Sequence, residues 1–343
     1  MNILLVGETH RGSRTPQRAQ ALRDLGHTVT EISTSPAGRR SESRPGVLDR
    51  VLYRLRLPLD RRDAGAAMAR AAGDHDLLIL DNARAVRPGM LRAARRAAPQ
   101  APFVWFSEDD MLNRIHRTRW IERSVALFDL CVTTKSFNAR PEEMPALGAR
   151  RVLFVNNTYC PHQHFSVPGT TGDGGRWGAP ISFVGTYEKP RAEAMLDLAQ
   201  AGLPVRIWGN GWNRMRACHP NMKVENRPVY GEEYRWVVGS SAINLCFLRH
   251  GNRDRQTCRS IEIPAMGGFM MHEYSEEMAA LIVPDREAVY FRDTAELIER
   301  CRSWSCNAAR QDVAAAGHRR VTQAGFSHAE RWRFILEQAM AGK

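Results

Sequence analysis

Short apolar runs alternate with segments of helical spacing, and this alternation limits the fold more than any other feature of the sequence. In the first half, strand-like runs cover residues 2–7, 27–32, 76–81, 102–106, 130–134 and 152–155. Segments with helical spacing fall between them at 16–25, 88–98 and 120–127. Apolar strands separated by helices are typical of a parallel sheet with helices on both faces. The sequence therefore predicts an α/β fold.

A glycine-rich segment, Gly169-Thr-Thr-Gly-Asp-Gly-Gly175, interrupts the alternation and predicts a domain boundary. After it, strands are expected at 181–184, 205–208 and 242–247, and helices at 191–201, 232–238 and from 294 onward. Because 343 residues exceed one typical core, we expect two doubly wound, Rossmann-like domains, at 1–168 and 176–325, facing across a cleft. A C-terminal helix within 326–343 is expected to pack back on the first domain. Ligands of such sheets bind beyond the carboxyl ends of the strands.

The composition is basic, with a net charge of +12 and a pI of about 9.8. A basic surface attracts anionic substrates and anionic membranes, whereas dispersed basic residues without zinc-finger spacing argue against nucleic acid as a partner. The seven cysteines include no C-x-x-C pair, which disfavours a zinc site or a disulfide framework. No apolar run reaches the length of about 18 residues that a membrane span needs, and the N-terminus enters a strand without a leader. We therefore expect a cytoplasmic protein, with any membrane contact peripheral and at the inner face.

The segment Arg259-Ser-Ile-Glu262-Ile-Pro-Ala-Met-Gly267-Gly268 reads as a short helix and a glycine turn before a buried strand. Arg259 and Glu262 are three residues apart and share one helix face. A carboxylate accepts hydrogen bonds from a sugar diol and an arginine pairs with phosphate, so the pair suits a sugar nucleotide. The ordinary alternative is an exposed ion pair on a helix that ends at glycine.

Three further segments point to the same ligand. The loop before that helix holds four arginines within eleven residues, a costly cluster without an anion, which suits a diphosphate. The loop after strand 181–184 leads into a helix start that carries two cations. The loop after strand 205–208 contains glycines that allow a ligand to approach the backbone. The segment before helix 232–238 suits a flat nucleotide base. The predicted nucleotide site comprises Gly185, Thr186, Lys189, Arg191, Gly209, Asn210, Gly211, Trp212, Val229, Tyr230, Arg249, Asn252, Arg255, Arg259 and Glu262. Solvated helix starts, packed tryptophans and a plain turn are the ordinary alternatives.

The order F-V-G-T-Y-E-K-P-R, I-W-G-N-G-W and R-S-I-E-I-P-A-M-G-G resembles the CgeB-type (spore maturation protein-like) glycosyltransferases of the GT-B clan. The similarity is specific over residues 181–291 and only architectural over the first domain. It implies a GT-B fold, a nucleoside-diphosphate sugar as co-substrate, no cofactor and no bound metal. In related retaining families, a carboxylate eight residues before the second glutamate contacts the donor sugar, and that glutamate binds the ribose. By position these are Asp254, where the pattern usually has glutamate, and Glu262, which implies a retaining reaction.

The first domain is expected to hold the acceptor. His10 follows the first strand and is a candidate base, or an ordinary polar loop residue. Glu108, Asp109 and Asp110 follow another strand. Because successive side chains of an extended chain face opposite sides, at most two of these carboxylates converge, and no other metal ligand accompanies them. We therefore predict no metal, and we assign Glu108 or Asp109 to the acceptor hydroxyl.

Residues 47–57 form a basic amphipathic segment. Such a segment rests on a membrane surface or contacts a lipid-linked acceptor, or it is a core helix with a solvated basic face. Two other functions also stay open at this point. A sugar-nucleotide epimerase of similar architecture would need no acceptor, and a non-enzymatic protein would bind anionic glycans or nucleic acid without turning over a donor. The acceptor class (glycan, lipid-linked, protein or natural product) is not specified by the sequence.

Overall fold

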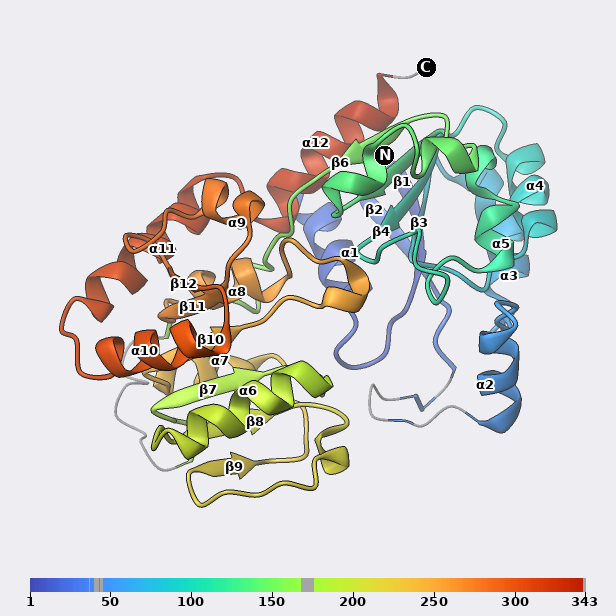
Figure 1. Cartoon of the computed structure of the whole chain (residues 1–343). Coiled ribbons are helices and arrows are strands. Elements are labelled where there is room, and N and C mark those ends of the chain that lie inside the picture. Colours follow the sequence, from blue (N-terminus) through green and yellow to red (C-terminus); the bar gives the residue numbers. More distant parts are fainter. Residues whose placement is uncertain (37, 40–42, 44–45, 168–175, 342–343) are drawn as a thin grey trace. The chain divides into compact units, whose positions relative to one another are not determined.

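The computed structural model describes residues 1–36, 38–39, 43, 46–167 and 176–341, in which the chain forms two compact units (Figure 1). The first unit comprises Met1–Asn156, His250–Asp254 and His328–Lys343, and the second comprises Asn157–Arg249 and Arg255–Ser327. The segment proposed from sequence as the domain boundary, 169–175, lies outside the described residues. A short loop from the middle of the second half thus belongs to the first unit, a placement that the sequence does not indicate.

The first unit contains a six-stranded parallel sheet in the order β2-β1-β3-β4-β5-β6. Its strands are β1 (Asn2–Gly7), β2 (Thr28–Ser33), β3 (Leu77–Asp81), β4 (Phe103–Ser107), β5 (Leu130–Thr133) and β6 (Val152–Phe154). Its helices are α1 (Thr15–Asp24), α2 (Val47–Arg54), α3 (Ala64–Ala71), α4 (Pro88–Ala97), α5 (Arg119–Glu122) and α12 (His328–Met340).

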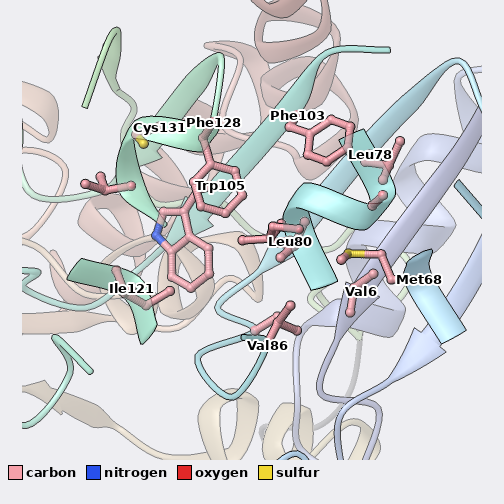
Figure 2. Packing of buried hydrophobic residues seen from close by; sticks show 14 of the residues in the cluster. Val6, Met68, Leu78, Leu80, Val86, Phe103, Trp105, Ile121, Phe128 and Cys131 are labelled. Carbon is pink, nitrogen blue, oxygen red and sulfur yellow. The ribbon is translucent and has the colours of Figure 1, made fainter. Parts of the chain in front are cut away.

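Alternate residues of its central strands enter two hydrophobic cores, one on each face of the sheet. Val6 of β1 packs in the core that includes Met68 of α3 (Figure 2). Its neighbour Leu5 packs in the other core, which includes Trp332 of α12. Both faces of β1 are therefore buried, and this is why the strand is a continuous apolar run rather than an alternating one.

The second unit contains another six-stranded parallel sheet, in the order β12-β11-β10-β7-β8-β9. Its strands are β7 (Ile181–Val184), β8 (Val205–Trp208), β9 (Met222–Val224), β10 (Ile243–Cys246), β11 (Met270–Glu273) and β12 (Val289–Phe291). Its helices are α6 (Lys189–Gln200), α7 (Glu232–Ser240), α8 (Arg259–Ala265), α9 (Glu276–Leu281), α10 (Thr294–Ser305) and α11 (Arg310–Gln323).

The predicted fold class, two doubly wound parallel sheets with helices, is confirmed. The sequence pattern does not predict β9 and β12, which are the two edge strands of the second sheet and only three residues long. The single helix predicted at 120–127 is wrong, because α5 ends at Glu122 and a separate 3-10 turn follows at Val125–Leu127. Among the described residues, none of the helices combines the length and the apolar character needed to span a membrane.

Candidate active site

The start of α6 carries a buried arginine whose charge is only partly compensated. Arg191 lies in the first turn of α6, and its side chain is 3% exposed. Its Nη1 contacts the carbonyl oxygen of Thr186 at 3.3 Å and a carboxylate oxygen of Glu188 at 3.3 Å. Its Nε and Nη2 atoms are buried and have no hydrogen-bond partner among the described residues. Two donors of a buried guanidinium are therefore available for a ligand.

Other arginines intensify this positive charge. Burial and then the charge of Arg259 lower the pKa of Arg191 to about 10. Glu188 opposes this shift, and Arg249 adds a further, smaller lowering effect. The Nε of Arg259, at the start of α8, is likewise buried without a partner in the described chain. Three of the arginines predicted from sequence thus influence one another electrostatically. A cluster of cations with unused donors is suited to a multiply charged anion such as a diphosphate.

The loops after β7 and β8 touch each other through two of the predicted glycines. A Cβ on Gly209 would lie 1.8 Å from the carbonyl oxygen of Gly185, so only glycine fits there. The indole Nε1 of Trp212 donates to that same carbonyl oxygen at 2.8 Å, and the Trp212 side chain is buried in the core of the unit. Gly209 and Trp212 therefore hold the two loops together, which is the packing alternative that the sequence analysis left open.

Glu262 lies on α8 and is buried, with its carboxylate 3.8 Å from the Nε2 of His164. The helix ends soon afterwards, where Gly267 adopts a positive φ of 75°. The Glu262 side chain is only 4% exposed, and acidic side chains are seldom buried to this degree. His164 was not identified from the sequence, because it lies about a hundred residues away and in no recognisable motif.

A buried polar chain supports the start of α8. The Ser260 Oγ accepts a hydrogen bond from the backbone N of Thr257 at 2.9 Å and lies 2.7 Å from the Nε2 of His272 on β11. Burial opposes ionisation of the nearby Cys246 thiol, yet the His272 and Arg259 charges lower the pKa of that thiol below its usual value. These residues were also missed from sequence, where isolated Cys, Ser and His positions carry no signal. Their contacts fix the position of α8 relative to β10 and β11.

The other predicted nucleotide residues of the second unit lie in mixed environments. Lys189 is exposed, and its ammonium group lies 3.6 Å from the carboxylate of Glu193 one helical turn away. Val229 is buried in a hydrophobic core beside Tyr234 and Trp208. Thr186 and Arg255 are exposed, and Tyr230 is half-buried. Asn210 accepts a hydrogen bond at its backbone oxygen from Tyr187, and Gly211 adopts a left-handed φ of 82°. The backbone around Asn210 and Gly211 and the arginine cluster are thus better suited to binding a nucleotide than Lys189 is.

The loop 250–254 places two predicted residues, Asn252 and Asp254, in the first unit. The Asp254 carboxylate is buried and lies 2.6 Å from the Nζ of Lys135, and it also accepts a hydrogen bond from the Nδ2 of Asn252 at 2.6 Å. Within the same unit, Arg253 forms a two-nitrogen ion pair with Asp110. Burial alone would raise the pKa of Asp110, but hydrogen bonds from Arg253 and Asn138 lower it below its usual range. Lys135 was missed from sequence, although it is one of only four lysines.

A polar cavity of about 200 Å³ lies at the carboxyl ends of β1, β3 and β4 in the first unit. His10 and Glu108 both line it, so the structure brings together two residues predicted to act on the acceptor. The Nδ1 of His10 lies 3.0 Å from the hydroxyl oxygen of Ser35. The Glu108 carboxylate lies 2.6 Å from the guanidinium of Arg18, a buried side chain that also binds Asp81. The other residues lining the cavity are Glu8, Gly12, Ser13, Arg14, Thr15, Arg18, Asp81 and Asn82.

The three consecutive carboxylates after β4 point to different partners. Asp109 accepts a hydrogen bond from the Nδ2 of Asn82 at 3.2 Å and lies 3.5 Å from the Nδ1 of His116. Glu108 pairs with Arg18, and Asp110 pairs with Arg253. Over the described ranges, no three His, Cys, Asp or Glu side chains come together to form a metal site. Asn82, the hydrogen-bond partner of Asp109, lines the polar cavity.

Several solved structures share this two-unit fold. HepE of Anabaena, solved with UDP and glucose, is 12% identical, with a TM-score of 0.64 over 99% of this chain and 100% of that chain. A sucrose-phosphate synthase from Thermosynechococcus elongatus is 11% identical, with a TM-score of 0.65 over the whole of both chains. An α,α-trehalose-phosphate synthase (UDP-forming) from Burkholderia vietnamiensis is 11% identical, with a TM-score of 0.62 over 99% of this chain and 100% of that chain. The fold is therefore that of the GT-B glycosyltransferases.

The sequence comparison agrees with the fold. Residues 191–337 match the family model described as "Glycosyl transferase-like". No curated protein matches the chain. The chain therefore combines a glycosyl transferase-like match over residues 191–337 with a GT-B fold over its whole length. The narrower resemblance to CgeB-type enzymes stays a prediction.

Proposed function

We propose that the protein transfers a sugar from a nucleoside-diphosphate donor, held by the second unit, to an acceptor hydroxyl held by the first. The observation that carries this proposal is Arg191, a buried arginine with two unpartnered nitrogen atoms beside the charges of Arg259 and Arg249. The HepE structures with UDP and with UDP-glucose support the choice of donor class. A nucleoside diphosphate supplies the negative charge that this cluster lacks.

In the proposed reaction, the bond between the anomeric carbon and the diphosphate oxygen breaks, and a bond to the acceptor oxygen forms. Negative charge grows on the departing diphosphate in the transition state. Arg191 and Arg259 would stabilise that charge in a site of reduced dielectric, where fixed charges act most strongly. We propose no metal for this step, since the arginines supply the neutralisation that a metal would otherwise provide.

Glu262 is proposed to accept hydrogen bonds from the ribose hydroxyls. Its burial on α8 and the support of α8 by Ser260 and His272 favour this role, because a fixed carboxylate loses little entropy when it binds a diol. Asp254 is proposed, on the resemblance alone, to act on the donor sugar in a retaining reaction. Its present contacts with Lys135 and Asn252 would have to be shared with the sugar hydroxyls.

On the acceptor side, we propose that His10 accepts the proton of the acceptor hydroxyl, with Glu108 orienting that hydroxyl. Both line the polar cavity of the first unit. The ion pair with Arg18 holds the Glu108 carboxylate in position. Asp109 is proposed to orient the Asn82 amide, which lines this cavity.

We propose a cytoplasmic location with a peripheral contact at the inner face of the membrane. All seven cysteines are free, as is usual in a reducing compartment. The net charge of +12 favours anionic surfaces.

Release of free nucleoside diphosphate from a panel of nucleotide sugars, with cell extract as a source of acceptor, tests the function. We expect release from at least one donor, retained in EDTA and strongly reduced in Arg259→Met. Arg292→Met is the matched control, because Arg292 is an exposed arginine of the same unit whose Nη1 lies 4.0 Å from the Glu296 carboxylate. Release that requires Mg²⁺ or Mn²⁺ would overturn the metal-independent mechanism. Conversion of the donor to an epimeric nucleotide sugar without any acceptor would overturn the transferase assignment.

A further inference from the structure

Helix α2 exposes its apolar side chains. None of its eight residues, all of which are described, is buried. Val47, Leu48 and Val51 are 68%, 57% and 47% exposed, and Leu55, just past the helix end, is 50% exposed. The core-helix alternative that the sequence left open is therefore wrong. Side chains of this kind are normally covered, so their exposure marks an interaction surface.

The charges of α2 are arranged around this apolar face. At 100° per residue, Val47, Leu48, Val51 and Leu55 fall within one arc of about 100°. Arg50 and Arg54 lie one turn apart beside the arc, and both are exposed. Neither forms an ion pair within the described part of the chain. We call this set of six residues the α2 surface.

The apolar surface continues beyond the helix. The Nε of Arg56 donates to the carbonyl oxygen of Arg117 at 2.7 Å, and the Nε1 of Trp120 donates to that of Pro58 at 3.0 Å. These bonds fix the end of α2 against the loop that carries Ile115, which is 59% exposed. Exposed apolar groups from two neighbouring segments are thus held in one region of the first unit.

We propose that the α2 surface binds an anionic phospholipid membrane. An apolar arc flanked by arginines allows the aliphatic groups to enter the acyl boundary while the guanidinium groups stay at the lipid phosphates. The net charge of +12 adds long-range attraction to such a surface. A second copy of the chain is a poorer occupant, because a symmetric contact through this face would bring Arg50 and Arg54 close to their own copies. The inference rests on the proposed peripheral contact and not on the donor site, since no residue of the α2 surface belongs to that site.

Cosedimentation with lipid vesicles tests the proposal. One set of vesicles contains phosphatidylcholine alone, and the other contains equal parts of phosphatidylcholine and phosphatidylglycerol. We expect wild-type protein to bind the second set and to be released by salt. The double variant Arg50→Glu/Arg54→Glu should bind at least about 30-fold more weakly, because each arginine near an anionic surface contributes about 1 kcal/mol. Leu48→Ser/Val51→Ser should weaken binding about tenfold or more through the lost apolar contact.

The matched control is Arg92→Glu/Arg96→Glu, which makes the same change of charge at the same spacing on the exposed side of α4 in the same unit. It should bind vesicles nearly as well as wild type, and all three variants should keep wild-type thermal midpoints and nucleotide affinity. Equal loss of binding in the control would show a general charge effect and overturn the α2 surface. Failure of wild type to bind any vesicle would overturn the peripheral contact itself. Self-association that disappears in Leu48→Ser/Val51→Ser would assign the surface to a second copy instead.

Discussion

Replacing Arg191 by methionine should make the ligand-free protein more stable while weakening nucleotide binding. Burial and the neighbouring charge of Arg259 lower the pKa of Arg191 well below its usual value, to about 10. For a base, a folded-state pKa below the unfolded value means that the charged form costs stability at every pH below about 10. That cost fades as the pH rises above about 10 toward the pKa of the unfolded chain. The difference corresponds to about 3 kcal/mol at neutral pH.

Methionine keeps the unbranched apolar stem and removes the charge. It also loses the Nη1 contacts with Thr186 and Glu188, worth about 1 kcal/mol or less each. The net gain is therefore about 1–2 kcal/mol, which for a unit of this size raises the thermal midpoint by roughly 2–8 °C. Loss of charged hydrogen bonds to the diphosphate should weaken binding by about 1.5–3 kcal/mol, or about ten- to more than a hundredfold.

Differential scanning calorimetry with and without a nucleoside diphosphate measures the first effect, and titration calorimetry measures the second. Arg206→Met is the control, because Arg206 is a largely buried arginine of the same unit whose guanidinium pairs with Glu225 at 2.7 Å. That variant should lose stability and keep nucleotide affinity. A lower midpoint for Arg191→Met with unchanged nucleotide affinity would refute the reasoning, since Arg191 would then be an ordinary structural arginine.

Three further predictions concern other contacts. Arg18→Met should destabilise the first unit by about 3–5 kcal/mol, because it leaves the buried carboxylate of Asp81 without its cation, and an unchanged denaturation midpoint would contradict this pairing. Gly209→Ala should lower the thermal midpoint sharply, because the new Cβ would lie 1.8 Å from the carbonyl oxygen of Gly185. Gly89→Ala is the control and should not lower it, because the space around Gly89 is open. Equal thermal midpoints for the two variants would argue against the close approach at Gly209. Asp109→Asn should reduce the rate of sugar transfer more than it weakens donor binding, and the wild-type enzyme should still transfer sugar in EDTA. A variant in which only the KM for the donor changes would contradict a role of Asp109 on the acceptor side.

The sequence was sufficient for the fold class and for the central strands. Strands such as β1 and β3 are buried on both faces, so their sequences are largely continuous apolar runs that stand out from their surroundings. The edge strands β9 and β12 of the second sheet have only three residues each, which is too short for a pattern to stand out. Local patterns therefore revealed every strand of the first sheet, including its edges β2 and β6, and the four central strands of the second sheet.

The sequence shows Arg249 and Arg259 in one arginine-rich segment, but the structure pairs Arg253 of that segment with Asp110 in the first unit and adds Arg191 from α6 to the cluster. The contacts that position the cluster could not be predicted. Ser260 and His272 meet only after β10 and β11 pair, and the contact of Lys135 with Asp254 joins residues more than a hundred positions apart. Glycines after a strand predict close approach of a ligand to the backbone. In the structure, Gly209 instead allows close approach of the loop that carries the carbonyl oxygen of Gly185. A sequence shows which residue types are available, but the tertiary structure decides which partner each one takes.

The central claim is that the second unit binds a nucleoside diphosphate through Arg191, Arg259 and Glu262. Titration calorimetry of the wild-type protein with paired nucleoside diphosphates and monophosphates tests it most directly. The account predicts that at least one diphosphate binds about tenfold or more tightly than its monophosphate, because the arginine cluster acts on the second phosphate. It also predicts that Glu262→Gln weakens the binding of that diphosphate but not the binding of its 2′,3′-dideoxy analogue. Equal affinities for diphosphate and monophosphate across the whole set of bases would contradict the account.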